Sequence, residues 1–440
     1  MGTRGPFSYA FIFVTEPAQS KLTRLIRYSP VVLPALALAL GATSGRGQIV
    51  SSYVPPELLA RSLEPKRSLI QLGMFDLNPH AGGSVIYDSN ITQGSKKTED
   101  DFIYVFSPGF DLFKTGERAR EDSATTLRAT YNPAFLFFTK HDTNNSIDHY
   151  VHLDAGLTLA RLTVSVNQDY ESSSGGAVDV GARVKQTYYR TSGVIRYEVS
   201  EKTSASISGS YRITDYENLI GSEEWIEDNS INYQITPKVS LGFGVSVGQL
   251  TVGRTPAPLT NFIGRAQAPE GDVQTFVTPG LRAGYKTTEK TDVSLSAGGE
   301  WRMFEDGSSS FGPVFSLTGS YRPTDTTDLS LEAHRREQNS AVLGGQNYIT
   351  TGFGVRVGQR FRERYRASVS FTYDNAEYQS AQRDISASRV DDYFLLRYGV
   401  DMILATSWTV GLFHQYRVNE SSSGFNFENH QVNLQTVWSY

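Results

Sequence analysis

The chain has no cysteine among its 440 residues. Without thiols it forms no disulfide, offers no thiolate ligand to a metal ion and has no cysteine nucleophile. A small secreted scaffold held together by disulfides is therefore excluded, and so are thiol-based metal centres and thiol-based enzymes.

Charged residues are scarce as well, at 20% of the chain against about 25% in soluble globular domains. The net charge of −5 and the pI of about 5.9 argue against a basic nucleic-acid-binding protein. Long apolar runs are also missing, because the run at residues 31–40 is shorter than the roughly 20 residues that a membrane-spanning helix needs. With a mean hydropathy of −0.33, the chain does not fit a bundle of membrane helices.

The run at residues 31–40 fits an export signal instead. Three cationic residues, Lys21, Arg24 and Arg27, precede it, and the small residues 41–45 follow it. A cationic start, a short apolar stretch and small residues describe a secretory signal peptide, with cleavage expected between residues 42 and 48. The alternative is a membrane anchor, for which the run is too short.

From about residue 78 onward, apolar and polar residues alternate over segments of roughly ten. In residues 239–247 the apolar side chains of Val239, Leu241, Phe243, Val245 and Val247 share one face, and serine and glycine occupy the other. Residues 203–213 and 364–373 repeat this pattern. Successive side chains of a strand point to opposite faces, so each segment is predicted to be a strand with one apolar and one polar surface.

Short and long connections between these segments alternate. The short ones lie at residues 160–161, 201–202, 237–238, 288–290, 324–326, 362–363 and 406–407. The longer ones lie at residues 88–100, 172–182, 216–224, 251–271, 338–346, 375–388 and 419–425. This rhythm predicts an all-β fold, a transmembrane antiparallel up-and-down β-barrel of about 18 strands (16 on other boundaries), with short periplasmic turns and longer extracellular loops.

The barrel interpretation divides the chain into three parts. Residues 1–47 are the signal peptide with a long cationic start, residues 48–77 a periplasmic leader or plug fragment, and residues 78–440 the barrel in the bacterial outer membrane. Aromatic residues near strand ends, such as Trp301, Tyr321, Tyr373, Tyr398 and Trp408, suit the two membrane interfaces. The last strand ends in Trp438 and Tyr440, which resembles the signal read by the barrel assembly machinery.

The polar face of the strands is the predicted lumen, and arginine dominates its charge. The chain has 30 Arg and 11 Lys, and the guanidinium group binds carboxylate, phosphate and sulfate with two hydrogen bonds. An anion-favouring lumen is one interpretation, and a ladder of arginines paired with carboxylates such as Glu198, Glu300 and Glu332 is the other. The lumen candidates are Arg190, Arg196, Arg212, Arg282, Arg302, Arg336, Arg356, Arg360, Arg364, Arg366 and Arg397.

The sequence contains little that indicates catalysis. A hydrolase in a barrel needs a serine, a histidine and an orienting group near the rim, and no such set is recognisable among the seven histidines. His141, His149 and His152 are close in sequence but lack further metal ligands. We expect no catalytic residues, no metal and no cofactor.

The first predicted strand runs into Tyr87-Asp-Ser-Asn-Ile91. This opening resembles that of a family of outer-membrane beta-barrel porins that accompany exopolysaccharide biosynthesis and export. The resemblance implies an outlet for exopolysaccharide, supplied by periplasmic polysaccharide-export components. Two alternatives stay open, a passive porin for small anionic solutes and a structural or adhesive barrel with a closed lumen; the sequence shows neither the cargo nor the oligomeric state.

Overall fold

The structure is a computed structural model that describes residues 50–52, 70–95, 98–114, 125–254, 271–287, 290–342, 346–380 and 389–439. The chain divides into Met1–Leu36, which lies outside these residues, and Ala37–Tyr440, which holds every described strand. The strands are β1 (Val50–Ser52), β2 (Ile70–Leu72), β3 (Phe75–Asp88), β4 (Asp101–Lys114), β5 (Thr125–Phe138), β6 (Ser146–Thr158), β7 (Leu162–Ala177), β8 (Ala182–Glu198), β9 (Thr203–Tyr216), β10 (Ser222–Thr236), β11 (Val239–Val252), β12 (Asp272–Thr287), β13 (Thr291–Met303), β14 (Ser309–Thr324), β15 (Thr327–Asn339), β16 (Gln346–Phe361), β17 (Tyr365–Ser380), β18 (Arg389–Ala405), β19 (Trp408–Ser421) and β20 (Phe427–Ser439).

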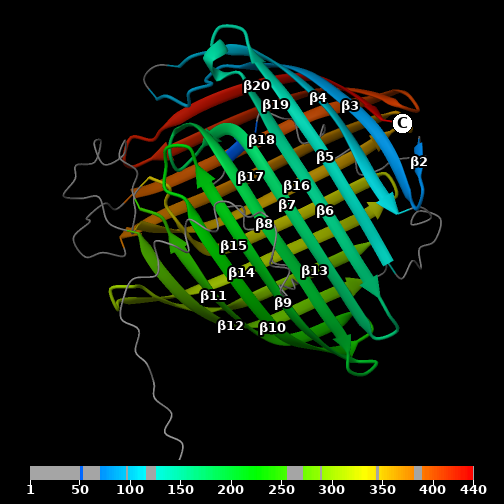
Figure 1. Cartoon of the computed structure of the whole chain (residues 1–440), viewed down its shortest axis with the longest axis vertical. Helices are drawn as coiled ribbons and strands as arrows, with labels where there is room; N and C mark the ends of the chain where they lie inside the picture. Colours follow the sequence, from blue (N-terminus) through cyan, green and yellow to red (C-terminus); the bar gives the residue numbers. More distant parts are fainter. Residues whose placement is uncertain are drawn as a thin grey trace, which may run out of the picture. The chain divides into compact units, whose positions relative to one another are not determined.

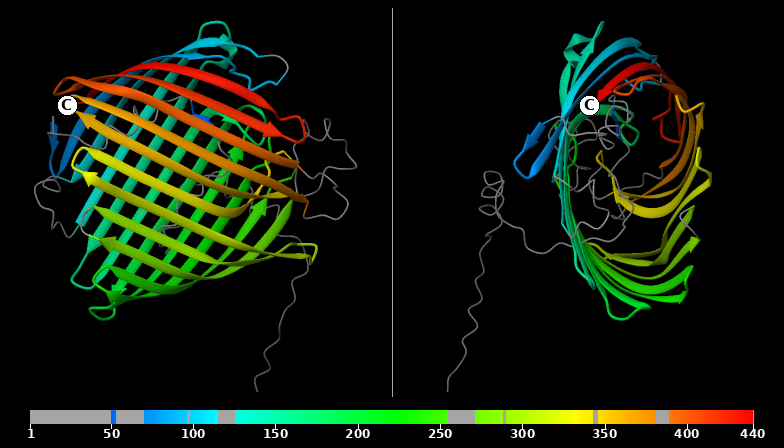
Figure 2. Two further views of the ribbon diagram at one scale, coloured as in Figure 1. Left: turned by 180° about the vertical axis from the view of Figure 1, so that it is seen from behind. Right: turned by 90° about the vertical axis from the view of Figure 1, so that its right-hand side faces the viewer.

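Strands β3 to β20 form a closed antiparallel barrel of 18 strands (Figure 1). Each strand pairs with its neighbours in sequence, and β20 pairs with β3, from Gln431 opposite Asp88 to Ser439 opposite His80. This pairing gives hydrogen-bond partners to the backbone N–H and C=O groups at the free edges of the first and last strands, which would find none in the hydrocarbon of a membrane. Figure 2 shows the front and back walls inclined steeply in opposite directions, as the strand tilt of a closed barrel requires. The predicted fold and strand number are confirmed.

The outer face of the barrel is apolar and exposed. Ile231, Leu281 and Phe311 are 61%, 68% and 61% exposed, although each lies within a regular strand, β10, β12 and β14 respectively. Such a surface is unfavourable in water, whereas lipid tails cover it at no cost. Among the interfacial aromatics, Trp301 contacts Phe311 of the next strand, with 4.5 Å between the ring centres and the two rings tilted by 40°. No helix among the described residues is long and apolar enough to cross a membrane.

The two ends of the barrel differ in their connections, largely as predicted. At one end the turns β6–β7, β8–β9, β10–β11, β14–β15, β16–β17 and β18–β19 hold two to four residues. The exception there is the β4–β5 connection, residues 115–124, which the sequence pattern did not single out. The long loop expected at residues 172–182 is mostly strand, because β7 and β8 continue to Ala177 and from Ala182 and pair with each other.

Two short strands, β1 and β2, precede the barrel in the chain and pair with its strands. β2 pairs with β3 in a tight hairpin, from Ile70 opposite Leu77 to Leu72 opposite Phe75. β1 pairs antiparallel with the end of β7, from Val50 opposite Ala177 to Ser52 opposite Gly175, and appears within the barrel in Figure 2. The predicted signal peptide, residues 1–47, and Tyr440 lie outside the described residues.

Candidate functional site: the lumen and its closure

The predicted lumen arginines lie on the inward faces of their strands. On β8, β9, β12, β13, β15, β16 and β17 the exposed large apolar side chains have odd numbers and the candidate arginines have even numbers. On β18 the parity is reversed, so that Arg397 faces inward opposite to the exposed Tyr398 and Val400. Arg364 is the exception, because it lies in the turn between β16 and β17.

About half of the candidates are held by carboxylates. The closest pairs are Arg282 with Asp228 at 2.5 Å, Arg212 with Glu224 at 2.5 Å and Arg302 with Glu300 at 2.7 Å. Arg302 also lies 3.5 Å from Glu337 and donates a 2.8 Å hydrogen bond to Gln274. Arg196 and Arg366 pair with Glu198 and Asp328 at 2.8 and 3.6 Å. The charge of these five arginines is therefore paired within the barrel wall.

Five further candidates, Arg190, Arg336, Arg356, Arg360 and Arg364, make no ion pair within the described part of the chain. The last three are exposed and lie toward the end of the barrel with short turns, which is the periplasmic end. Arg397 forms a 3.4 Å hydrogen bond with Gln415 and stacks over Phe413. The uncompensated positive charge of the lumen therefore gathers at the periplasmic entrance and at Arg190 and Arg336.

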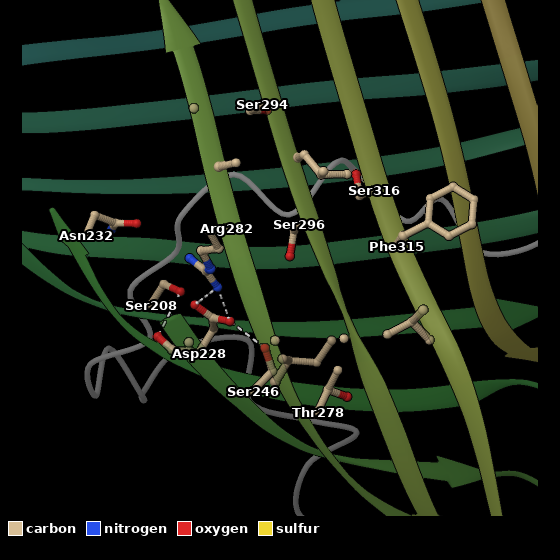
Figure 3. A pocket seen from close by; sticks show the side chains of 18 of the residues that line it. Ser208, Asp228, Asn232, Ser246, Thr278, Arg282, Ser294, Ser296, Phe315 and Ser316 are labelled. Atoms are coloured by element: carbon tan, nitrogen blue, oxygen red, sulfur yellow. Dashed lines mark hydrogen bonds and ion pairs between the residues drawn. The ribbon is translucent and has the colours of Figure 1, made fainter. Parts of the chain in front are cut away.

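A cavity of about 580 Å³ occupies the lumen between β8 and β15. Its lining extends from Glu201 and Lys202 in the periplasmic β8–β9 turn to Arg336 near the extracellular end of β15. Figure 3 shows the Arg282–Asp228 pair on its wall, surrounded by small polar side chains. These are Ser208, Asn232, Ser246, Thr278, Ser294, Ser296 and Ser316. A second cavity, of about 450 Å³, includes Arg356 and Glu332.

The β7–β8 hairpin leaves the barrel wall and crosses the lumen. β7 pairs with β6 only as far as Ser172, and β8 pairs with β9 only from Gln186. We call residues 173–185 the inward hairpin. β7 and β8 are the fifth and sixth strands of the barrel, yet the tip contacts β17 and β18, the fifteenth and sixteenth. The inward hairpin thus reaches the opposite wall on the extracellular side.

Asp179 fastens the tip of the inward hairpin. Its carboxylate accepts hydrogen bonds from the Tyr378 hydroxyl at 2.6 Å and from the Ala341 backbone N–H at 3.0 Å. The Arg389 guanidinium lies 3.6 Å from the carboxylate and donates a 2.8 Å hydrogen bond to the Asp179 carbonyl. Asp179 is only 3% exposed, and this burial raises its pKa above the ordinary value, although Arg389 and Tyr378 act in the opposite direction.

Other loops join the closure from around the rim. The Ile220 N–H donates a 2.9 Å hydrogen bond to the Ala341 carbonyl, which links the β9–β10 loop to the β15–β16 loop. Phe425 in the β19–β20 loop packs under Arg389, with the guanidinium carbon 3.7 Å from the ring centre. The extracellular side is therefore narrowed by contacts between four loops, among them one that joins residues 121 positions apart, Ile220 and Ala341.

A known protein family matches the C-terminal part of the chain. Residues 282–439, from β12 to β20, match the family described as "Putative beta-barrel porin 2". The chain is an outer-membrane β-barrel, and this part of it is similar to that porin family. The match covers less than half of the chain, and its region includes Arg302, Arg336 and the partners of Asp179 on β17 and β18. No curated protein sequence matches the chain.

Solved structures of outer-membrane barrels are similar to this chain over most of its length. OccK2 (OpdF) of Pseudomonas aeruginosa is 8% identical with a TM-score of 0.45, over 83% of this chain and 98% of that chain. The siderophore receptor PirA of Pseudomonas aeruginosa is 8% identical with a TM-score of 0.41, over 82% and 80%. OccAB2 of Acinetobacter baumannii is 9% identical with a TM-score of 0.41, over 83% and 98%. These likenesses carry no residue-level correspondence, so the lumen is interpreted from its own side chains.

Sequence reasoning missed two carboxylates that organise the lumen. Asp228 was not recognised as inward, although the alternation of Ile231, Tyr233 and Ile235 on the outward face of β10 would have placed it there. Asp179 had no such signal, because its partners lie 161 to 210 residues away. The three clustered histidines are separated: His141 contacts Asp101, His149 contacts Tyr131 and His152 contacts Asp169.

Proposed function

We propose that this porin-type barrel is an outlet for an exopolysaccharide, with a lumen that favours anionic cargo. The observation that supports it is the cavity, which extends from the periplasmic turns into the barrel and carries more free positive than free negative charge. A cargo that enters from the periplasm meets the exposed Arg356, Arg360 and Arg364 first. Periplasmic polysaccharide-export components would deliver the polymer to this entrance.

The small polar lining supports a carbohydrate cargo. Serine, threonine and asparagine side chains offer both donors and acceptors, and none of them presents a bulky obstacle. A polymer can exchange hydrogen bonds along such a wall without being trapped at one point. The inward arginines add a positive field that acts over about 10 Å at moderate salt.

Neutralising the entrance tests this function. Arg356→Gln, Arg360→Gln and Arg364→Gln together should reduce polymer export and shift the reversal potential in a salt gradient toward cation preference. Lys140→Gln is the control, because Lys140 lies in an external loop and pairs with Asp100 at 2.6 Å. Unchanged secretion and unchanged ion selectivity, at equal barrel abundance, would contradict the proposed function.

A passive porin for small anionic solutes is the second candidate, because about 580 Å³ holds a small solute more readily than a polymer. Restored uptake of small anions in a porin-deficient strain, without any effect on polymer in the native host, would favour it. A structural or adhesive barrel with a closed lumen is the third candidate, which the inward hairpin supports. A barrel that conducts no ions under any condition would favour that one.

A further inference from the structure

Arg336 differs from the other inward arginines of the extracellular half. Its Nε has no hydrogen-bond partner, and no carboxylate lies within ion-pair distance in the part of the chain that the structure describes. Asp374, the nearest acidic group on β17, instead lies 3.4 Å from His334. Arg302, at the same end of the barrel, has Glu300, Glu337 and Gln274 around its guanidinium.

A buried nitrogen that has lost water and gained no partner, as the Arg336 Nε has, is unfavourable. An anion that enters the cavity and binds Arg336 removes this penalty, and a planar carboxylate does so with two parallel hydrogen bonds. Arg190 lines the same cavity from β8 and adds a second positive charge without an acidic partner among the described residues. Arg336 is thus an unpaired cationic side chain that can bind an anionic group.

The rest of the cavity recognises a different chemistry. Ser296 and Asn232 present a hydroxyl group and an amide that make no side-chain hydrogen bond within the described part of the chain (Figure 3). Ser208 and Ser246 donate to Asp228, and Thr278 donates to Glu300, so these three hydroxyl groups offer acceptor lone pairs. These groups match the hydroxyl groups of a sugar, each of which donates and accepts a hydrogen bond. A volume of about 580 Å³ accommodates one or two sugar units with water around them.

We propose that this cavity is a binding site for an acidic sugar, in which Arg336 holds the carboxylate and the hydroxyl-lined wall holds the ring. The site rests on the proposed function and makes it more specific, because it names a sugar acid rather than any anion. It also assigns different roles to two sets of arginines. Arg356, Arg360 and Arg364 attract anions at the entrance, whereas Arg336 binds one.

Equilibrium binding to the purified full-length barrel in detergent tests the site, whether or not the pore is open. The probes are D-galacturonate, its neutral counterpart D-galactose, and acetate, which has the carboxylate without the ring. We expect saturable calorimetric binding of galacturonate only. Arg336→Gln should weaken it by about tenfold to a hundredfold, the range of a charge-assisted hydrogen-bond pair. Arg336→Lys, which keeps the charge but loses the planar fork, should lose part of the affinity.

Arg360→Gln is the matched control, since it removes an unpaired entrance arginine that does not line this cavity. It should leave galacturonate binding unchanged while it alters ion selectivity. Equal affinity of wild type and Arg336→Gln for galacturonate would overturn the site, and so would an absence of binding to the wild type. Equally tight binding of acetate would overturn the sugar specificity. None of these binding results decides the proposed function, which is tested separately by polymer export and ion selectivity.

Discussion

Individual ion pairs decide how much of the arginine content is available to cargo. Arg282 and Asp228 are 24% and 16% exposed, and they also form hydrogen bonds with Ser230 and Ser246, respectively. Their charges are therefore neutralised within the barrel wall. In a largely buried ion pair the two charges depend on each other, because the loss of one partner leaves the other desolvated and unpaired. The paired arginines are therefore structural, and the unpaired ones can act on cargo.

Removing the two kinds of charge should have opposite effects on barrel stability. Asp228→Ala leaves Arg282 without its partner and should lower the free energy of unfolding by about 1–3 kcal/mol. Arg336→Met removes a charge that has no partner and should leave the stability unchanged or raise it. Unfolding in urea, followed by the heat-modifiable mobility of the barrel on gels, measures both variants. A larger loss for Arg336→Met than for Asp228→Ala would mean that Arg336 is satisfied in the folded barrel.

The inward hairpin is the element on which conduction depends. Residues 173–185 make no ladder hydrogen bond to β6 or β9, so the hairpin can move without breaking the barrel wall. Besides the polar contacts of Asp179, the hairpin is held by its pairing with β1 at residues 175–177 and by Val178, which packs against Tyr393 and Phe427. Gly181, at φ +60°, makes the turn that presents Asp179 to the opposite wall.

Locking or releasing the tip should change conductance in opposite directions. A Cβ at Gly181 would lie 3.6 Å from the Cβ of Phe425, within the range for a disulfide. Gly181→Cys with Phe425→Cys should therefore form a disulfide that lowers single-channel conductance, and a reductant should reverse the effect in this otherwise cysteine-free chain. Asp179→Ala should raise the conductance. Asp142→Ala, in an exposed external turn, is the control. Identical conductance of all variants would show that the hairpin does not limit flow.

Acidic conditions should favour the docked hairpin. Burial raises the pKa of Asp179, so the docked form takes up a proton more readily than the released form, and docking becomes more favourable as pH falls through the raised pKa. The groups that face Asp179 are Arg389 from β18, with Asp391 beside it, Tyr378 from β17 and Ser340 from the β15–β16 loop. Tyr216 from β9 and Tyr348 from β16 also interact electrostatically with its carboxylate. Conductance should fall as the pH is lowered through the raised pKa of Asp179, and Asp179→Asn should lose this dependence. A conductance that rises on acidification would contradict the assignment.

At the scale of the whole molecule, closure of the barrel depends on the last strand. β20 completes the wall by pairing with both β19 and β3, and Trp438 lies opposite Trp408 on one side and Ala81 on the other. Neither neighbour can close the barrel by itself, because an unpaired strand edge is not tolerated in hydrocarbon. The C-terminal strand is therefore needed to close the barrel.

Shortening or altering the C-terminus should reduce assembly. Trp438→Ala combined with removal of Tyr440 is expected to lower the amount of heat-modifiable barrel in the outer membrane, because the proposed assembly signal and an interfacial aromatic are both lost. Tyr398→Ala, another exposed aromatic within the wall, is the control. Normal abundance of the doubly altered chain would refute the assembly signal at Trp438 and Tyr440.

The fold could be predicted from the sequence because it depends on local repetition. Alternation with period two assigns the faces of β9, β11 and β17, and the rhythm of the connections gives the strand number and the two ends, since neighbouring strands in sequence are neighbours in space. The inward direction of Arg190, Arg282 and Arg336 follows from the same alternation. The tertiary structure decided which of these arginines are neutralised, because Asp228 reaches Arg282 across 54 residues. It also decided that the β7–β8 connection crosses the lumen, because Asp179 and Arg389 are 210 residues apart and meet only after the barrel has closed.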